Sequence, residues 1–390
     1  MAGLSGRVRD IHAGGAGVKP GDVIGGYRVV SEPTNADGGK CMWAFAEKDG
    51  KEYFLKRFLE PKRPREGSAG SAASRRIRLE TCREFEDRHR SIMELLRPDA
   101  SGAGNLVLAT DFFHAGSTYY KVTERIDTAG LDSPHTLPAK QRTVLLRTLA
   151  TSLRLLHDID VVHGDLKPAN VLVQKREGAA FHTAKLIDFD DSYLSGSPPA
   201  REDIAGDSLY GAPEWRRYVQ GDEDVASADL TTAVDMFALG LMTHLYLTGT
   251  LPAHADRFGS PADAVNAGEP LVADERLGTA TQALIGAATA ADPKSRPTVA
   301  DFLTALRDPG ACTLHDTPQP RPATTAAKDG PARPAAARSR VRVNPPDRSG
   351  PPPDRSAHRP PAAGDGPRTS RVRINLGPRR AGPPRRPSHP

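Results

Sequence analysis

The sequence predicts an α+β fold, in which a small antiparallel sheet with one helix precedes a larger, mainly helical part. Three observations lead to this prediction. Strand-like patterns occupy residues 27–58 and 106–124. Apolar side chains recur at spacings of three and four over residues 73–96 and 139–157, as in amphipathic helices. Strands concentrated at the start and helices at the end are typical of α+β proteins.

The chain begins with a segment, residues 1–20, that is rich in Gly and Ala and lacks the apolar stretch of a signal peptide. We expect this leader to be flexible. Strands are then predicted over Tyr27–Val30, Cys41–Ala46 and Glu52–Phe58. The sequence Lys48-Asp49-Gly50-Lys51 predicts a tight turn between the last two strands.

A long helix is predicted from Ala73 to Leu96. Glu86 falls on its inward stripe, where a carboxylate needs a partner, although it could also be a boundary residue of a charged helix. The apolar side of this helix is formed by Cys82, Phe85, His89, Ile92, Met93 and Leu96.

Two further strands, Leu106–Phe113 and Thr118–Glu124, are expected to complete the sheet. The next helix is predicted over Ala139–His157 and the last one over Thr298–Arg307.

Charge is distributed unevenly along the 390 residues. The net charge is +5, but residues 309–390 hold sixteen Lys or Arg and only five Asp, so residues 1–308 are net negative. Residues 309–390 contain no Phe, Trp or Tyr and are rich in Pro, Arg, Ala and Gly. Such a segment cannot bury enough apolar area to offset its ordering entropy, so we expect a disordered basic tail.

The three cysteines, Cys41, Cys82 and Cys312, form neither a paired framework nor a metal-ligand cluster. This favours reduced thiols in a cytoplasmic protein. No apolar run approaches the roughly 18 residues that a membrane-spanning helix requires, so we expect no membrane span.

Polar residues interrupt an apolar stretch in the middle of the chain. Residues Val161 to Val173 read Val-Val-His-Gly-Asp-Leu-Lys-Pro-Ala-Asn-Val-Leu-Val, as expected of a catalytic loop between two short strands. A second apolar run, Lys185-Leu186-Ile187, leads into Asp188-Phe189-Asp190. A surface loop with polar residues would explain either segment alone, but less readily both in this order.

The first segment resembles the catalytic loop of protein kinases, HRDLKxxN, and the second resembles their metal-binding DFG segment. The resemblance implies that Asp165 accepts the proton of the attacking hydroxyl and that Lys167 places a positive charge beside the phosphoryl group. It implies that Asn170 and Asp188 hold Mg²⁺, which prefers oxygen ligands. His163 would have a supporting role.

The sequence Tyr53-Phe54-Leu55-Lys56 resembles the V-A-I-K of the third kinase strand, which implies that Lys56 contacts the phosphates of ATP. The other reading is a solvated strand lysine. The same resemblance implies an ion pair between Lys56 and Glu86. Phe54 departs from the family, because a small Ala usually lies there beneath the adenine, so we expect an unusually shaped nucleotide pocket.

Gly38 and Gly39 lie where kinases have a glycine-rich loop over the ATP phosphates, although an ordinary hairpin loop explains them nearly as well. The resemblance further implies that Glu124 and Ile126 belong to the hinge, whose backbone meets the adenine.

Three later segments also resemble protein kinases. Gly206 to Glu214 is similar to the G-T-x-x-Y-x-A-P-E that ends the activation segment. Asp235 corresponds to the buried aspartate that anchors the catalytic loop, and Arg296 to the arginine that pairs with the glutamate of A-P-E. We expect both to be structural.

Two residues depart from the family pattern. Gly164 replaces an Arg that in many kinases binds a phosphorylated activation loop, so we expect constitutive competence and little effect of Gly164→Arg on basal activity. Asp190 replaces the Gly of DFG, and we expect it to take up the left-handed backbone, which Asp tolerates.

The resemblance covers residues 21–308 and implies a two-lobed protein-kinase-like fold, with an N-lobe over 21–126 and a C-lobe over 127–308. It is similar to the eukaryotic-like Ser/Thr kinases of bacteria and implies ATP as cofactor and a protein Ser or Thr as acceptor. One alternative is a phosphotransferase of the aminoglycoside or choline type, and another is a catalytically weak ATP-binding scaffold. Lys167 favours Ser/Thr over Tyr.

The tail repeats Ser339-Arg340-Val341-Arg342-Val343-Asn344 as Ser370-Arg371-Val372-Arg373-Ile374-Asn375. Either copy could dock on the sheet edge of a partner protein or be autophosphorylated at its Ser, or the repeat could be a coincidence of composition. Specific nucleic-acid binding is not expected, because the tail has no aromatic side chains for base stacking.

Overall fold

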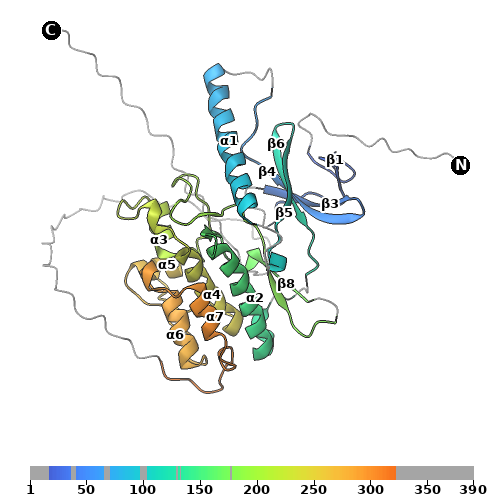
Figure 1. The fold of residues 1–390 in the computed structure, drawn as a ribbon. Helices are drawn as coiled ribbons and strands as arrows, with labels where there is room; N and C mark the ends of the chain where they lie inside the picture. Colours follow the sequence, from blue (N-terminus) through green and yellow to red (C-terminus); the bar gives the residue numbers. More distant parts are fainter. Residues whose placement is uncertain are drawn as a thin grey trace, which may run out of the picture. The chain divides into compact units, whose positions relative to one another are not determined.

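Six antiparallel strands form the first part of the fold (Figure 1). The computed structural model describes residues 17–36, 41–65, 71–96, 103–128, 131, 133–175 and 178–321, all of which belong to one compact unit. Its sheet runs in the order β1-β2-β3-β4-β6-β5. The strands are β1 (Val23–Ile24), β2 (Tyr27–Val29), β3 (Cys41–Lys48), β4 (Lys51–Phe58), β5 (Ala109–Ala115) and β6 (Thr118–Glu124).

The predicted turn between β3 and β4 is confirmed. Lys48 pairs with Lys51, and both intervening residues have positive φ, 52° at Asp49 and 73° at Gly50. A two-residue turn of this kind matches the twist of the strands that it joins. It therefore fixes the register that brings Lys56 opposite Trp43.

The helix α1 (Ala72–Leu95) lies beside this sheet (Figure 1). Ser71 caps it, since its side chain accepts a hydrogen bond from the backbone N–H of Ser74. Its buried residues Cys82, His89 and Ile92 belong to the predicted stripe. The helix begins and ends one residue before the predicted bounds.

The remaining elements form the mainly helical part of the fold, which confirms the α+β prediction. Its short strands form two antiparallel pairs, β7 with β10 and β8 with β9, of which only the second is a hairpin. The elements are α2 (Ala139–His157), β7 (Val161–Val162), β8 (Val171–Gln174), β9 (Thr183–Leu186), β10 (Tyr193–Leu194), α3 (Pro213–Val219), α4 (Ala233–Thr248), α5 (Pro261–Asn266), α6 (Thr279–Ala288) and α7 (Val299–Ala305).

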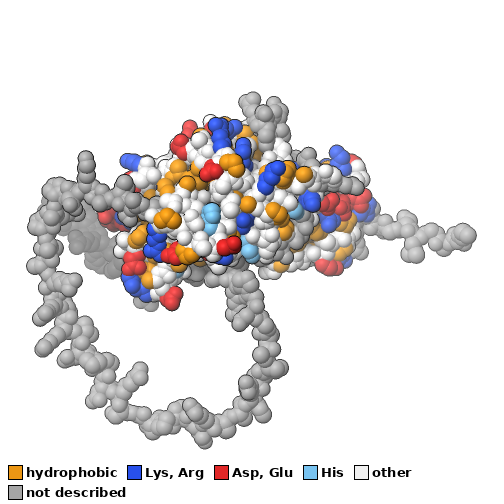
Figure 2. All heavy atoms as spheres, turned by 90° about the horizontal axis from the view of Figure 1, so that it is seen from below, with side chains coloured by type: hydrophobic (Ala, Val, Ile, Leu, Met, Phe, Trp, Pro, Cys, Tyr) orange, Lys and Arg blue, Asp and Glu red, His pale blue; other side chains and the backbone are white. Residues whose placement is uncertain are grey.

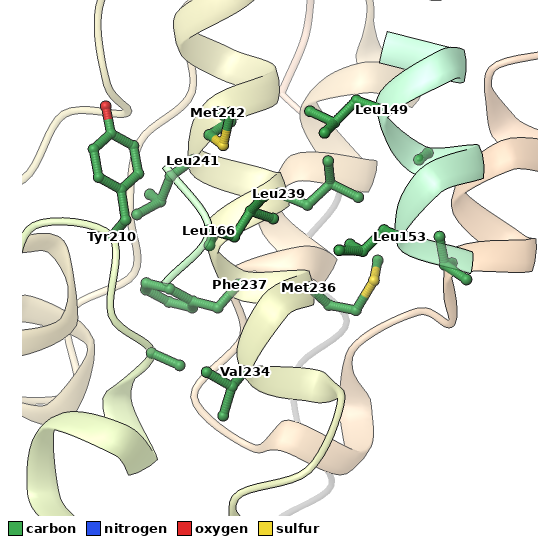
Figure 3. Packing of buried hydrophobic residues seen from close by; sticks show 14 of the residues in the cluster. Leu149, Leu153, Leu166, Tyr210, Val234, Met236, Phe237, Leu239, Leu241 and Met242 are labelled. Carbon is green, nitrogen blue, oxygen red and sulfur yellow. The ribbon is translucent and has the colours of Figure 1, made fainter. Parts of the chain in front are cut away.

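Helix α4 is the centre of the helical part, because it is apolar on all sides and almost wholly buried. Figure 3 shows its side chains packed against Leu149 and Leu153 of α2 and against Leu166. Leu166 belongs to the loop between β7 and β8, residues 163–170, which we call the polar loop. Leu149 and Leu153 are completely buried. The polar loop is therefore attached to the main hydrophobic core by its own leucine.

The structure corrects the predicted start of β5. This strand begins at Ala109, not Leu106, because Leu106 and Val107 pair elsewhere. Leu106 forms a parallel bridge with Leu186, and the N–H of Val107 donates to the carbonyl of Leu186 at 2.9 Å. The segment before β5 is thereby attached to β9 of the helical part.

The expected boundary between fold and tail at residue 308 is also corrected. Cys312 is completely buried, and the hydroxyl of Thr281 donates to the carbonyl of Ala311 at 2.7 Å. The folded part therefore extends beyond residue 308. Residues 1–16 and 322–390, which hold most of the predicted leader and tail, lie outside the described residues.

The three cysteines are free and buried. Within the described ranges, no helix is both long enough and apolar enough to cross a membrane. Acidic, basic and apolar side chains are intermingled over the face shown in Figure 2.

Candidate active site

A single carboxylate of α4 holds the loop between β7 and β8, residues 163–170. Asp235 accepts hydrogen bonds from the backbone N–H of His163 at 2.8 Å and of Gly164 at 3.1 Å. Its side chain is almost fully buried, and His157 Nε2 lies 3.1 Å from it. The anchoring role predicted for Asp235 is thereby confirmed, and the backbone of the loop is fixed to the core helix.

This loop brings together the three polar side chains that the sequence singled out. Lys167 Nζ donates to the two carboxylate oxygens of Asp165 at 3.0 and 2.8 Å. Asn170 Nδ2 donates to the carboxylate of Asp165 at 3.0 Å and to its carbonyl at 2.8 Å. All three residues are buried. The carboxylate is thus held in one orientation, as a positioned base requires.

Asp188 lies next to this loop because β8 and β9 form a hairpin. Val171 pairs with Leu186, and the N–H of Ile187 donates to the carbonyl of Asn170 at 3.0 Å. Asp188 itself has a φ of 63°. The left-handed residue of the segment is thus Asp188, and our expectation that it would be Asp190 was wrong.

Lys56 joins the sheet to this segment. Its Nζ lies 2.8 Å from both carboxylate oxygens of Asp188 and 2.6 Å from Oδ2 of Asp190. The structure therefore places Lys56 beside Asp188, and its contact with the phosphates of ATP stays a prediction.

The predicted ion pair between Lys56 and Glu86 is not formed. Glu86 Oε1 accepts hydrogen bonds from Arg63 Nη1 at 2.6 Å and from the hydroxyl of Tyr119 at 2.5 Å. Two donors hold this carboxylate, which explains why it does not reach Lys56. Its expected place as a nucleotide-site residue is corrected accordingly.

Three residues that the sequence reasoning did not assign to the site take the place of that ion pair. Asp190 is paired with Lys56, Lys121 Nζ lies 2.5 Å from Asp190 Oδ1, and His89 Nε2 lies 3.6 Å from the same oxygen. The sequence did contain signals. Lys121 interrupts an apolar strand, His89 lies on the buried stripe of α1, and Asp190 replaces the family Gly.

Burial and charge act in opposite directions on these groups. Burial alone would raise the pKa of Asp190, but Lys121 and Lys56 hold that pKa well below its usual range. Burial likewise disfavours the charged form of Lys56, and Asp188 and Asp190 nevertheless raise its pKa well above the ordinary value. Both groups are therefore ionised at neutral pH.

Asp191 shows the opposite balance. Burial, together with the negative charges of Asp165, Asp188 and Asp190, raises its pKa to about 7. The carboxyl group of Asp191 is therefore partly protonated at neutral pH.

Gly164 is required by the geometry of the loop. Its φ is 79°, and a Cβ atom there would lie 2.5 Å from the backbone oxygen of Asp191 and 3.2 Å from the ring of Tyr193. A backbone oxygen cannot move aside as a flexible side chain can. We therefore now expect Gly164→Arg to strain the loop, in place of our expectation that it would leave basal activity intact.

The sheet face that carries Lys56 is aromatic, in keeping with the departure at Phe54. The rings of Phe54 and Trp43 stack with centroids 5.2 Å apart, and Phe45 lies 6.4 Å from Phe54. Residues paired across adjacent strands share a face, and Trp43 pairs with Lys56 while Phe45 pairs with Phe54. An adenine bound on this face would meet rings where kinases usually offer a small residue.

Glu124 and Ile126 line a cavity of about 670 Å³. Its other lining residues include Met93 of α1, Lys121 and Phe189. Lys56 and the polar loop 163–170 are not among the described residues that line this cavity. The adenine-contacting role of Glu124 and Ile126 stays a prediction. Gly38 and Gly39 lie outside the described residues.

The end of the activation segment is fixed by a buried ion pair. Arg296 Nη1 and Nη2 donate to the two carboxylate oxygens of Glu214, both at 2.7 Å, as predicted for this pair. Nη1 also donates to the carbonyl of Ala233, at the start of α4, at 2.8 Å. Near the polar loop, Lys167 Nζ lies 3.6 Å from Asp207.

The donor set suits a magnesium ion that is shared with a nucleotide. Mg²⁺ is usually bound by one or two carboxylates together with substrate phosphates. Asp188 supplies a carboxylate, and Asn170, whose Nδ2 is engaged with Asp165, retains its amide oxygen for a cation. Among the described residues, no group of three or more His, Cys, Asp or Glu forms a metal site made of protein ligands alone.

The sheet with one helix, the helical part and the loop anchored by Asp235 together define a protein kinase fold. A family model described as the protein kinase domain matches residues 39–306, more than half of the chain, and the chain belongs to this family.

Curated relatives agree with this assignment. The chain is 29% identical over 150 residues to serine/threonine-protein kinase pkn2 of Myxococcus xanthus, covering 38% of this chain and 17% of that protein. It is 32% identical over 120 residues to serine/threonine-protein kinase D3 of Mus musculus, covering 31% and 12%. It is 31% identical over 159 residues to serine/threonine-protein kinase/endoribonuclease IRE1b of Arabidopsis thaliana, covering 41% and 17%. The matches span less than a fifth of each relative.

Proposed function

We propose that this protein is a Ser/Thr protein kinase that transfers the γ-phosphoryl group of ATP to a hydroxyl of a protein. The observation that carries the proposal is the fixed cluster of Asp165, Lys167 and Asn170 next to Asp188. Phosphoryl transfer demands positioning and charge stabilisation more than covalent chemistry, and this cluster supplies both.

Each residue of the cluster has a defined part in the proposed reaction. Asp165 orients the acceptor hydroxyl and accepts its proton. Lys167, now paired with Asp165, faces the transferring phosphoryl group, and Lys56 contacts the nucleotide phosphates. Asp188 and Asn170 hold Mg²⁺, which when bound neutralises charge on the phosphates. ATP and Mg²⁺ are therefore the proposed cofactors.

The acceptor class rests on four features of the chain. Lys167, the Ala212-Pro213-Glu214 sequence, Asp235 and Arg296 are features of protein kinases that small-molecule phosphotransferases generally lack. The relatives named above are also serine/threonine-protein kinases by name. The protein's own Ser339 and Ser370 are further candidate acceptors and the tail a candidate docking segment, but both lie outside the described residues. A cytoplasmic location remains a prediction.

The proposal is tested by transfer of label from γ-labelled ATP with Mg²⁺ to a generic protein acceptor. Asp165→Ala and Asp188→Ala should each lower the rate at least about 10²-fold, the usual cost of losing a positioned base or metal ligand. Asp158→Ala, which removes an exposed carboxylate at the end of α2, is the matched control and should keep the wild-type rate.

Two outcomes would contradict the proposal. Wild-type rates in both Asp165→Ala and Asp188→Ala would remove these residues from the reaction. Transfer to aminoglycosides or choline, with none to any protein acceptor, would favour a small-molecule phosphotransferase instead.

A further inference from the structure

The ammonium group of Lys56 is held from the segment that follows β9, and not from helix α1. In the arrangement usual in protein kinases, the strand lysine pairs with a glutamate of the helix, and this pair must be in place for catalysis. Here the helix carboxylate, Glu86, is engaged by Arg63 and Tyr119. The partners of Lys56 are Asp188 and Asp190.

Three side chains from separate elements surround the carboxylate of Asp190. Its side chain is only 11% exposed, with one oxygen 2.6 Å from Lys56 Nζ and the other 2.5 Å from Lys121 Nζ. His89 of α1 closes the third side at 3.6 Å. A buried carboxylate is tolerated only where partners of opposite charge compensate its desolvation. The two lysines provide that compensation.

Lys121 is placed for this contact by the sheet. Lys56 on β4 pairs directly with Lys121 on β6, so the two side chains leave the same face of the sheet side by side. Two adjacent ammonium groups would repel each other without an anion between them. Asp190 bridges them, and with Asp188 it balances the two positive charges.

We infer that Asp190 is the positioning residue for Lys56, in place of a carboxylate on α1, and that Lys121 holds Asp190 in that position. The inference rests on the proposed function, since it concerns how Lys56 meets the phosphates of ATP. One three-residue segment then supplies both a metal ligand, Asp188, and the anchor of the phosphate-binding lysine. The position of Glu86 becomes immaterial to the reaction.

The test compares full-length variants by the affinity for Mg²⁺–ATP, measured by titration calorimetry, and by kcat and KM for phosphoryl transfer. Asp190→Asn keeps the size of the side chain but removes its charge. It should weaken ATP binding and lower kcat/KM by about 10- to 100-fold, as expected when a positioning contact is lost. Glu86→Gln should change both by less than about twofold. Glu84→Gln, at an exposed position of α1, is the matched control.

A double variant distinguishes a loss of ATP binding from a loss of folding. Asp190→Asn leaves two neighbouring lysines with one carboxylate, whereas Asp190→Asn combined with Lys121→Met restores the charge balance. The double variant should melt near the wild type and keep the ATP-binding defect. A conservative Asp190→Glu variant should recover part of the affinity, which a purely structural role would not predict.

The outcomes separate this inference from the proposed function. Wild-type ATP affinity in the folded double variant, or a loss in Glu86→Gln as large as that in Asp190→Asn, overturns the inference while the kinase assignment stands. Binding of ATP that depends on Asp190, without transfer to any protein acceptor, supports the inference and overturns the proposed acceptor. A wild type that binds no ATP overturns both.

Discussion

The polar loop 163–170 and the lysine cluster, defined as Lys56, Lys121, Asp188 and Asp190, lie on two sides of the same site but are held by different forces. The loop is fixed by backbone hydrogen bonds to Asp235 and by Leu166 in the core. The cluster is fixed by ion pairs between side chains from separate elements. The backbone hydrogen bonds follow from the fold, whereas the ion pairs depend on which charged side chains lie within reach of one another.

Because of this difference, we expect substitutions in the two regions to affect different properties of the protein. Damage to the support of the loop should act on folding as a whole. Damage around the cluster should act on ATP binding and on the pH dependence of stability. Three substitutions, taken from the largest expected effect to the smallest, test this division.

Arg296→Met should give the largest loss of stability. It leaves the buried Glu214 without its partner and removes the bond to Ala233 at the start of α4. Breaking a buried ion pair from one side costs about 3–5 kcal/mol, measured here by urea unfolding. Replacing Glu214 by Met as well should recover part of that loss. A cost below about 1 kcal/mol for the single change would show that the support of α4 lies elsewhere.

Gly164→Ala should have an intermediate effect, because Gly164 lies where the loop meets Asp191. The positive φ alone costs a residue with a side chain about 1–2 kcal/mol, and the contact of 2.5 Å with the backbone oxygen of Asp191 adds to it. Gly221→Ala is the matched control, since Gly221 has a φ of 84° but a Cβ added there would meet no atom within 4 Å. Phosphoryl transfer should fall in the first variant only. Equal stability losses in both would mean that the loop moves aside.

Asp191→Asn should have the smallest effect, visible as a change of slope. Burial and the neighbouring carboxylates raise the pKa of Asp191 to about 7 in the folded protein, so the folded state binds more protons than the unfolded state between about pH 4 and pH 7. The contribution of Asp191 to stability must therefore fall as pH rises through this window. Between pH 5 and pH 8 the wild type should lose more stability, or gain less, than Asp191→Asn, measured by urea unfolding, and the exposed Asp256→Asn should follow the wild type. An identical pH dependence in the wild type and Asp191→Asn would contradict the assignment.

The sequence predicted those parts of the structure that depend on local pattern. Helix α2 has the predicted bounds, and α1 is displaced by one residue. Asp165, Lys167 and Asn170 lie close together because they belong to one short loop, as expected, although their hydrogen bonds to one another were not predicted. Such features require only neighbouring residues and the period of the apolar side chains.

The parts that could not be predicted depend on competition between distant groups. Glu86 had the right place on α1 to reach Lys56, but Arg63 and Tyr119 engage it instead. The late start of β5 has the same origin, because Leu106 and Val107 pair with β9. Periodicity shows that a segment can form a strand, but it does not show with which neighbouring strand the segment will pair.

The attachment of Val107 to Leu186 has a mechanical consequence. The chain passes from the sheet to the helical part near Arg125, and the link at Val107 ties the two parts together a second time. Both attachments run through the backbone and together they define an axis, whereas the ion pairs of Lys56 and Lys121 with Asp188 and Asp190 are made by flexible side chains. Opening of the nucleotide site should therefore be a rocking motion about one line, and free twisting of the sheet against the helices is disfavoured.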